Sequence, residues 1–468
     1  DEAHHLEDAS TGALSYRVTR SDIDRLFDEL GGTASGILGR FSAQLQRALK
    51  PPDYASAANA IERASDLAFR VENEMRKFFL TLEEFMLQER NGGEISDYGQ
   101  QVRVVPATQH QPIWDEVGEK WQNTSDPLES LTRLLDNLLK NISDENQVSH
   151  EEMDDSLGDL SGVLRRLKEI LEYISAMVFE LDQNVICWIE LSSQYNNLSL
   201  NFAPLQIGPL MENYLWHTKD CVILTSATLT ANNSFDYIKA RLNADEADEL
   251  ILGSPFDYEN SALLFLPTDM PEPIDARNYQ RFVERAILQT AKATGGRMLA
   301  LFTSYRQLLE TSRLIKPHLE REGIQVYEQG TGASTSSLLD SFRATERSVL
   351  FGTKSFWEGV DVPGEALSVL MIVKLPFDVP SDPIIAARSE TFENPFAEYT
   401  LPEAILRFRQ GFGRLIRTQS DRGVVAILDR RIRSKQYGQL FLQSLPNCHL
   451  VESSIEDLPE SSTRWLNF

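Results

Sequence analysis

Apolar side chains recur every three or four positions from about Thr19 to Gln183, and this interval predicts long amphipathic helices. The runs that show it most clearly are Ile61, Leu67, Val71 and Met75; Leu131, Leu134, Leu135 and Leu138; and Leu164, Leu167, Ile170, Leu171 and Ile174. Each run falls on one helix face, so we expect these residues to form a core. Three segments predict breaks between the helices. They are the turn residues Pro51-Pro52 and Asn91-Gly92-Gly93, and the acidic residues 143–155.

The pattern changes to short apolar runs after about residue 185. Residues 185–191 and 198–202 read as paired strands, and 221–224 as a strand that ends at Thr225-Ser226-Ala227-Thr228. After residue 235 strands alternate with helices. The predicted strands are 263–266, 298–302, 324–327, 348–351, 367–373 and 424–428, and the predicted helices are 279–293, 305–320, 402–410 and 435–444. This alternation predicts an α/β fold with a parallel sheet covered on both faces, in which ligands bind at the carboxyl ends of the strands.

The composition fits a multidomain globular protein, with 468 residues of which 42% are hydrophobic. No apolar run reaches the roughly 18 residues of a membrane span, and the acidic start differs from a signal peptide, so we expect no membrane contact and a cytoplasmic location. Cys187, Cys221 and Cys448 lack metal-ligand spacing and are predicted to be packing residues.

The net charge of −25 argues against a surface that binds nucleic acid everywhere, because phosphate contacts need Lys and Arg. Basic residues are concentrated between Arg407 and Lys435, an interval that is also rich in glycine and apolar residues. An exposed basic helix face would not explain that mixture. We therefore expect any nucleic-acid path to be local.

Two strings have residues suited to nucleotide chemistry. In Asp1-Glu2-Ala3-His4, the Asp would hold Mg²⁺ through water and the Glu would polarise an attacking water, although a solvated first helical turn explains four letters equally well. In the string from Gln410 to Arg417, Arg414 and Arg417 are three residues apart and are predicted to share a helix face. Such guanidinium groups match phosphate oxygens, although surface ion pairs are the alternative.

Three further strings follow predicted strands. The Gly-rich string 352–364 offers backbone N–H groups to an anion, with Glu358 and Asp361 available to an arginine or a ribose. Lys354-Ser355 resembles the end of a P-loop, but Thr353 replaces the required Gly, and GxxxxGK[ST] occurs nowhere in the 468 residues. The hydroxyl groups of Thr225, Ser226 and Thr228 either connect the DEAH carboxylates to a second domain or cap a turn. Ser304 in the string 301–305 is a candidate helix N-cap.

Taken in order, DEAH, TSAT, LFTSY, FWEGVDVPG and QGFGRLIR resemble the motifs of superfamily 2 helicases, specifically the DinG branch of the XPD-like DNA helicases. The resemblance is dense between about residues 197 and 446. It implies an ATP-dependent helicase that uses Mg²⁺ and moves 5′ to 3′ on single-stranded DNA. It also implies two RecA-like motor domains, with a mostly helical Arch inserted in the first. The corresponding segments are 1–18, a remnant of motor domain 1; 19–184, the Arch; 185–234, the return to motor domain 1; and 235–468, motor domain 2.

The resemblance also assigns roles to single residues. The catalytic set would be Asp1 as the Mg²⁺ ligand through water, Glu2 as the water-activating group, and Arg414 and Arg417 at the γ-phosphate. The coupling set would be His4, Ser226, Ala227 and Thr228. The nucleotide-binding set would be Gln410, Gly413, Glu358, Gly359 and Asp361. The DNA-binding set would be Ser304, Tyr305, Thr353 and Lys354.

The sequence departs from the family's pattern because the P-loop and the strands before DEAH are missing. We therefore expect this chain, as the C-terminal part of a helicase, to be inactive alone. We also expect it to act as a monomer and to have a role in DNA repair. The region where many relatives carry iron–sulfur cysteines is missing too, which leaves open whether a longer protein has a cluster or an exonuclease domain. The alternatives are a non-catalytic module that binds DNA or protein, and a fragment of a DEAH-type RNA helicase.

Overall fold

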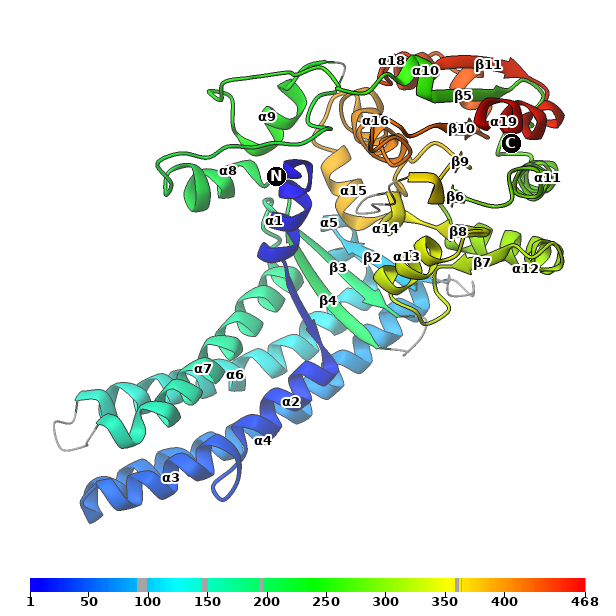
Figure 1. Cartoon of the computed structure of the whole chain (residues 1–468). Helices are drawn as coiled ribbons and strands as arrows, with labels where there is room; N and C mark the ends of the chain where they lie inside the picture. The colour runs from blue at the N-terminus through cyan, green and yellow to red at the C-terminus, as the bar shows by residue number, and fades with distance from the viewer. Residues whose placement is uncertain are drawn as a thin grey trace. The chain divides into compact units, whose positions relative to one another are not determined.

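The computed structural model describes residues 1–90, 99–144, 150–192, 197–231, 233–357, 362 and 364–467. The chain forms two compact units (Figure 1). The first contains residues 1–7, 207–380 and 388–468, and the second contains 8–206 and 381–387. None of the helices in these described ranges is both long enough and apolar enough to cross a membrane.

The first unit is built on a seven-stranded sheet in the order β11-β5-β10-β9-β6-β8-β7, in which all neighbouring strands are parallel. Its strands are β5 (Ala262–Pro267), β6 (Met298–Leu301), β7 (Gln325–Glu328), β8 (Ser348–Gly352), β9 (Val369–Ile372), β10 (Gly423–Ile427) and β11 (His449–Ser453). The predicted α/β class with a parallel sheet is confirmed, as are the six predicted strands. The sequence missed β11 because this edge strand is largely exposed and lacks a continuous apolar run.

Helices cover both faces of this sheet with separate apolar cores. One face packs against α11 (Ala276–Thr294), α12 (Tyr305–Arg321) and α19 (Leu458–Leu466). The other packs against α13 (Thr335–Ala344), α14 (Lys354–Trp357), α16 (Leu401–Phe412) and α18 (Gly438–Gln443). Because every strand runs in the same direction, the segments that follow β6, β8, β9 and β10 all emerge at one edge of the sheet.

The rest of the first unit is less regular. It contains η1 (Ala3–His5), the start of α1 (Leu6–Leu14), α8 (Gly208–Met211), η2 (Glu212–Trp216), α9 (Asp236–Leu242) and α10 (Tyr258–Ser261). The predicted strand 221–224 is wrong, since this segment forms no ladder with any described strand, and its Ile223 is 77% exposed. Apolar composition alone does not make a strand, because the backbone groups also need a neighbouring strand to bond.

The second unit combines helices with a four-stranded antiparallel sheet in the order β1-β4-β3-β2. Its strands are β1 (Tyr16–Thr19), β2 (Gln100–Val104), β3 (Val185–Leu191) and β4 (Leu198–Pro204). Its main helices are α2 (Arg20–Leu30), α3 (Gly36–Ala48), α4 (Pro51–Glu89), α5 (Pro106–Gln109), α6 (Pro112–Asp144) and α7 (His150–Phe179), and α15 (Pro383–Ser389) begins in it. The predicted pairing of β3 with β4 is confirmed. Both strands belong to the same unit as the helices that precede them.

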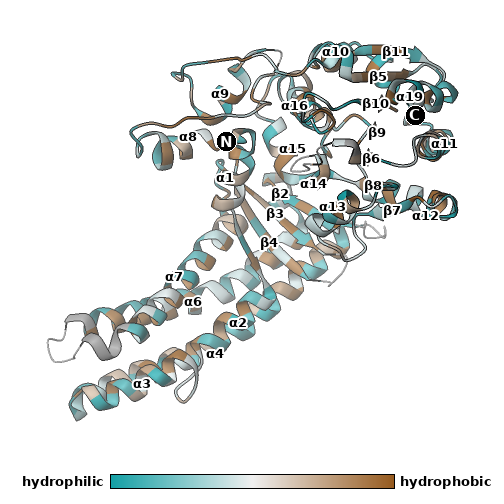
Figure 2. Ribbon diagram, viewed as in Figure 1, coloured by the Kyte–Doolittle hydropathy of each residue, from teal (hydrophilic) through white to brown (hydrophobic). Residues whose placement is uncertain are grey.

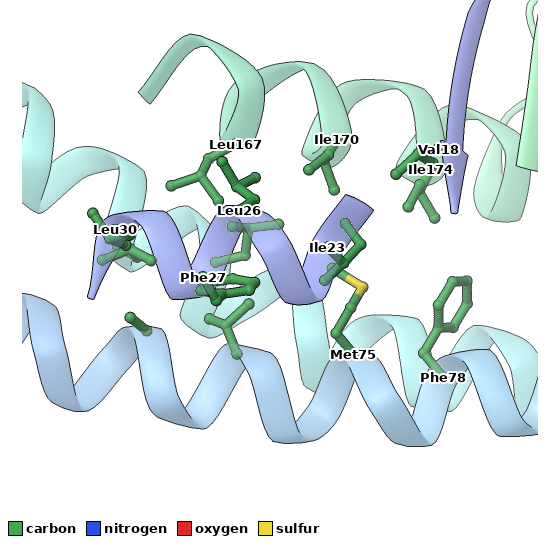
Figure 3. Packing of buried hydrophobic residues seen from close by; sticks show 14 of the residues in the cluster. Val18, Ile23, Leu26, Phe27, Leu30, Met75, Phe78, Leu167, Ile170 and Ile174 are labelled. Atoms are coloured by element: carbon green, nitrogen blue, oxygen red, sulfur yellow. The ribbon is translucent and has the colours of Figure 1, made fainter. Parts of the chain in front are cut away.

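The helical periodicity corresponds to a buried core in this unit. Leu26 and Phe27 of α2 lie between Met75 of α4 and Leu167 and Ile170 of α7, and all five side chains are buried (Figure 3). Hydrophobic and hydrophilic positions alternate along α3 and α4 (Figure 2). The loop predicted at 143–155 is wrong at 143–144 and 150–155, which are helical, and its remaining residues, 145–149, lie outside the described residues.

Candidate nucleotide and DNA site

The DEAH segment lies against the TSAT segment. The Thr225 hydroxyl donates to Asp1 Oδ1 at 3.0 Å, and Ala3 N donates to Thr225 O at 2.9 Å. His4 Nδ1 lies 2.7 Å from Ser226 Oγ, which is also 3.4 Å from Glu2 Oε2. The two segments that were predicted to act together are therefore hydrogen-bonded neighbours.

Glu2 has an unusual backbone conformation, with φ of 52° and ψ of 41°. A non-glycine residue rarely occupies this left-handed region, and where it does the surrounding contacts hold it there. Here the hydrogen bond of Ala3 N and the contact between Ser226 and the Glu2 carboxylate provide that support. The orientation of the Glu2 carboxylate is therefore set by its contacts with the TSAT segment and not by a regular helix.

The TSAT segment also contacts α16. Gln410 Nε2 donates to Thr228 Oγ1 at 3.4 Å, while Arg409 Nη1 donates to Thr230 O at 2.5 Å and Arg409 Nη2 to Ala227 O at 3.4 Å. Burial lowers the pKa of the Arg409 guanidinium. The sequence placed Arg409 only within a general basic cluster, and its position beside Gln410 was the one available signal for this contact.

The predicted helical pair Arg414 and Arg417 is wrong in its geometry. α16 ends at Phe412, and both arginines lie in the turn that follows. Leu415 and Ile416, in the same turn, are buried in the core. Asp421 Oδ2 holds this turn by accepting from Arg417 N at 2.7 Å.

Trp357 joins three of the motifs and was not singled out by the sequence. Its carbonyl oxygen accepts from Arg414 Nε at 3.2 Å, and its indole Nε1 donates to Phe302 O at 3.2 Å. The side chain is 1% exposed and packs over Gly411 of α16. Arg414, itself only 8% exposed, is thereby fixed to the strand end that carries LFTSY.

The predicted DNA-binding residues lie at the carboxyl ends of two adjacent strands, β6 and β8. Ser304 caps α12 and accepts from Gln307 N at 3.4 Å. Thr353 donates from both its N and its Oγ1 to Gln329 Oε1, each at 2.8 Å, and Lys354 is exposed beside it. Glu358, Gly359 and Asp361 lie outside the described residues.

A buried ion cluster ties the DEAH segment to α9. Glu7 Oε2 accepts from Arg241 Nε at 2.9 Å, and Glu7 Oε1 is paired with Arg388 Nη1 at 2.9 Å. The three side chains are between 4% and 11% exposed. Since an unpaired charge is costly at such burial, this cluster fixes the start of α1 strongly.

A second polar contact joins α9 to α16. Tyr237 OH donates to Glu403 Oε1 at 2.5 Å, and burial raises the pKa of the Glu403 carboxyl. Arg241 places its guanidinium 5.0 Å from the centroid of the Tyr399 ring, just before α16. α16 is therefore held at both ends: by α9 near Glu403 and by the TSAT segment near Gln410.

The donor set around Asp1 suits Mg²⁺ held mainly by water. The Asp1 carboxylate and the Thr225 hydroxyl lie together, and Mg²⁺ commonly takes one or two carboxylates and keeps several waters. Among the described residues no group of three or more His, Cys, Asp or Glu is arranged to hold a metal ion. Burial raises the thiol pKa of Cys187 and of Cys448 to about 12, as expected for packing residues. Cys221 is exposed, so the predicted packing role is wrong for that residue.

Comparison with known proteins identifies relatives over the whole chain. Residues 287–448 match the family model of a helicase C-terminal domain. The chain is 30% identical over 475 residues to the 3′-5′ exonuclease DinG of Bacillus subtilis, covering 98% of this chain and 50% of the relative. The chain is therefore similar along nearly its whole length to a DinG protein, and over residues 287–448 to a helicase C-terminal domain.

Other relatives match a shorter part of the chain. The ATP-dependent DNA helicase YoaA of Escherichia coli is 35% identical over 290 residues, 60% of this chain and 42% of that protein. The ATP-dependent helicase DinG of Mycobacterium tuberculosis is 36% identical over 276 residues, 57% of this chain and 40% of that protein. The chain thus spans about half the length, or less, of these relatives.

The two glycines of the DinG-type string QGFGR have different packing. A Cβ on Gly411 would lie 2.7 Å from Trp357 Cε3, whereas one on Gly413 would meet nothing closer than Arg409 O at 3.4 Å. We expect Gly411→Ala to lower the free energy of unfolding by about 1–3 kcal/mol, since overpacking displaces the indole. Gly413→Ala is the matched control and should change it by less than about 1 kcal/mol. Urea denaturation of both variants measures the difference, and equal effects would contradict this packing argument.

Proposed function

We propose that this chain is the C-terminal part of a DinG-type ATP-dependent DNA helicase, which couples ATP hydrolysis to 5′-to-3′ movement on single-stranded DNA. The observation that supports this best is the connected set of contacts from Asp1 and Glu2 through Ser226 and Thr228 to Gln410. The 468 residues contain no GxxxxGK[ST], so we propose that a P-loop on another segment completes the ATP site.

Each site residue would then have a separate role in phosphoryl transfer. ATP bound with Mg²⁺ would supply the γ-phosphoryl group. Asp1 would hold the ion through water, and the Glu2 carboxylate would orient the attacking water and accept its proton. Arg414 and Arg417 would stabilise the charge that develops on the phosphoryl oxygens. Gln410 and Gly413, with Glu358, Gly359 and Asp361, are proposed to line the nucleotide.

Coupling would pass through the hydroxyls between the DEAH segment and α16. His4 and Ser226 share one contact, Ser226 and Thr228 lie 3.5 Å apart, and Thr228 accepts from Gln410. A displacement at the phosphate would therefore move α16, and with it the strand ends that would hold DNA through Ser304, Tyr305, Thr353 and Lys354.

We propose that residues 235–468 form motor domain 2, 19–184 the Arch, and 1–18 with 185–234 motor domain 1, so that the compact unit containing residues 8–206 would combine the Arch with β3 and β4 of motor domain 1. We also propose a monomer that acts in DNA repair in the cytoplasm. Several relatives are named ATP-dependent helicases, which supports an ATP-dependent motor. The DinG-type strings favour DNA over RNA as the nucleic acid on which it moves. A chain that binds DNA without contributing to ATP hydrolysis is the competing function.

The experiment that tests this function compares two proteins. The 468-residue chain should bind a labelled single-stranded oligonucleotide in fluorescence anisotropy but show negligible ATP hydrolysis. A longer protein that joins it to a P-loop domain should hydrolyse ATP, be stimulated by single-stranded DNA and unwind duplexes with a 5′ tail in preference to a 3′ tail. Robust ATP turnover by the chain alone would contradict the fragment proposal. No turnover by the longer protein would favour the binding module, and preferential unwinding of RNA would favour an RNA helicase.

A further inference from the structure

Three aromatic rings near the ends of β9 and β10 have no role in the proposed site. Phe377 and Phe396 are stacked, with centroids 5.9 Å apart and planes at 28°, and Tyr437 meets them at 5.6 Å and 5.2 Å. Phe396 is 43% exposed, while Phe377 and Tyr437 are half-buried. Tyr437 meets Phe377 and Phe396 edge-on, at 84° and 60°, so the exposed Phe396 ring is held in place by two neighbouring rings. These three rings are referred to here as the aromatic platform.

The platform is anchored to the carboxyl edge of the sheet. Asp429 directly follows β10 and accepts from Leu375 N at 2.9 Å and from Arg431 Nε at 3.0 Å. The Arg431 guanidinium lies 5.5 Å from the Phe377 centroid. Since β10, β9, β6 and β8 are consecutive in the sheet, the platform shares its edge with Tyr305 and Lys354. Three strand spacings of about 4.8 Å place the ends of β10 and β8 roughly 15 Å apart along the edge, a separation that one bound DNA strand can span.

The charge beside the platform favours a polyanion. Residues 430–437, RRIRSKQY, carry four cations and no acid in a chain of net charge −25. Arg431 and Arg433 are paired with Asp429 and Glu452. The exposed Arg430 and Lys435 have no acidic partner in the part of the chain that the structure describes.

Acidic residues limit how a strand can lie there. Glu393 and Glu398 flank Phe396 and are exposed. A phosphate backbone would be repelled from that side, whereas the side of Arg430 and Lys435 attracts it. The bases of such a strand would then face the rings.

We propose that the aromatic platform of Phe377, Phe396 and Tyr437 stacks bases of single-stranded DNA, with Arg430 and Lys435 contacting the adjoining phosphates. The inference rests on the proposed function, and it adds a base-contacting subsite to the strand-end residues described above. Stacking on a ring is available to every base, so the subsite would bind DNA without sequence preference, as a motor that moves along DNA requires.

The test separates base contacts from phosphate contacts. Anisotropy with the 468-residue chain compares a labelled dT15 strand with an abasic strand of the same length. We expect Phe396→Ala to weaken binding of dT15 by about 5- to 150-fold, the range for the loss of one stacked base, and to leave binding of the abasic strand unchanged. Phe396→Trp should restore binding of dT15. Replacing Arg430 and Lys435 with Gln should weaken both strands equally and reduce the salt dependence of binding.

Tyr214 provides a matched control, because it is 64% exposed in the same unit and lies outside the platform. Tyr214→Ala should bind both strands like the parent chain. Equal weakening of both strands by Phe396→Ala, or no weakening of dT15, would overturn the platform while leaving DNA binding intact. Failure of the parent chain to bind either strand would instead overturn the proposed function, and the platform with it.

Discussion

Replacing Glu7 with Ala is expected to lower the free energy of unfolding of the first unit by about 3–5 kcal/mol, because it leaves two buried guanidinium groups without their carboxylate. Arg241 and Arg388 both bind Glu7, and their side chains are 10% and 4% exposed. Water cannot replace the carboxylate at this burial. Hydrogen exchange in a urea series, followed on peptides from α9 and α16, measures the loss within the first unit.

The control for this prediction is Glu456→Ala. Glu456 pairs with Arg285 at 3.0 Å, but the two side chains are 70% and 44% exposed. Removal of this exposed pair should cost at most about 1 kcal/mol, since water solvates both groups when they separate. Peptides from α4 and α6 belong to the other unit and should keep their exchange rates in both variants. A loss from Glu7→Ala no larger than that from Glu456→Ala would show that the cluster is not a stabilising anchor.

Replacing Arg414 with Ala is expected to lower kcat for ATP hydrolysis about 10³-fold or more in a protein that contains this chain and a P-loop, because an arginine at the γ-phosphate supplies transition-state stabilisation of that size. Arg414 is suited to this role by its anchoring, since Trp357 O accepts from its Nε at 3.2 Å and orients the guanidinium plane. Steady-state kinetics at saturating ATP and DNA should show a loss in kcat larger than any change in KM.

Two further variants make the result specific. Arg414→Lys keeps the charge but loses the planar fork, so we expect it to recover only a small part of the rate. Arg422→Ala removes a nearby exposed arginine that stacks on Trp465 at 4.9 Å, and it should leave kcat within about twofold of the parent. A loss below tenfold for Arg414→Ala, or an equal loss for Arg422→Ala, would rule out the proposed role of Arg414.

Where periodicity is strong, the sequence predicted the fold well. The buried strands β6 and β8 to β10 have continuous apolar runs because both faces of each strand are covered, and that run is visible without the structure. The segment 221–224 has the same kind of run but no partner among the described strands, so it stays irregular. Strand formation depends on a neighbour as much as on composition.

The candidate site was predictable in its parts and not in its connections. The sequence indicated that DEAH, TSAT and the string from Gln410 act together, and the structure shows that Thr228 lies against Gln410. It did not indicate Arg409, Trp357 or Glu7, because each acts through a partner far along the chain. The helical face predicted for Arg414 and Arg417 failed for a similar reason, since both arginines lie after the end of α16 in a turn that Asp421 holds through Arg417 N.

The sequence by itself determined the parallel sheet, the helical unit and the residue types of an ATP and DNA site, because those depend on local periodicity and on side-chain chemistry. Only the tertiary structure decided how α16 is held, by Glu403 at one end and Gln410 at the other, and where the rings of Phe377, Phe396 and Tyr437 meet. These features depend on contacts between segments that are distant in the sequence. Packing of the whole unit determines those contacts, and they produce no periodic pattern of residues from which they could be predicted.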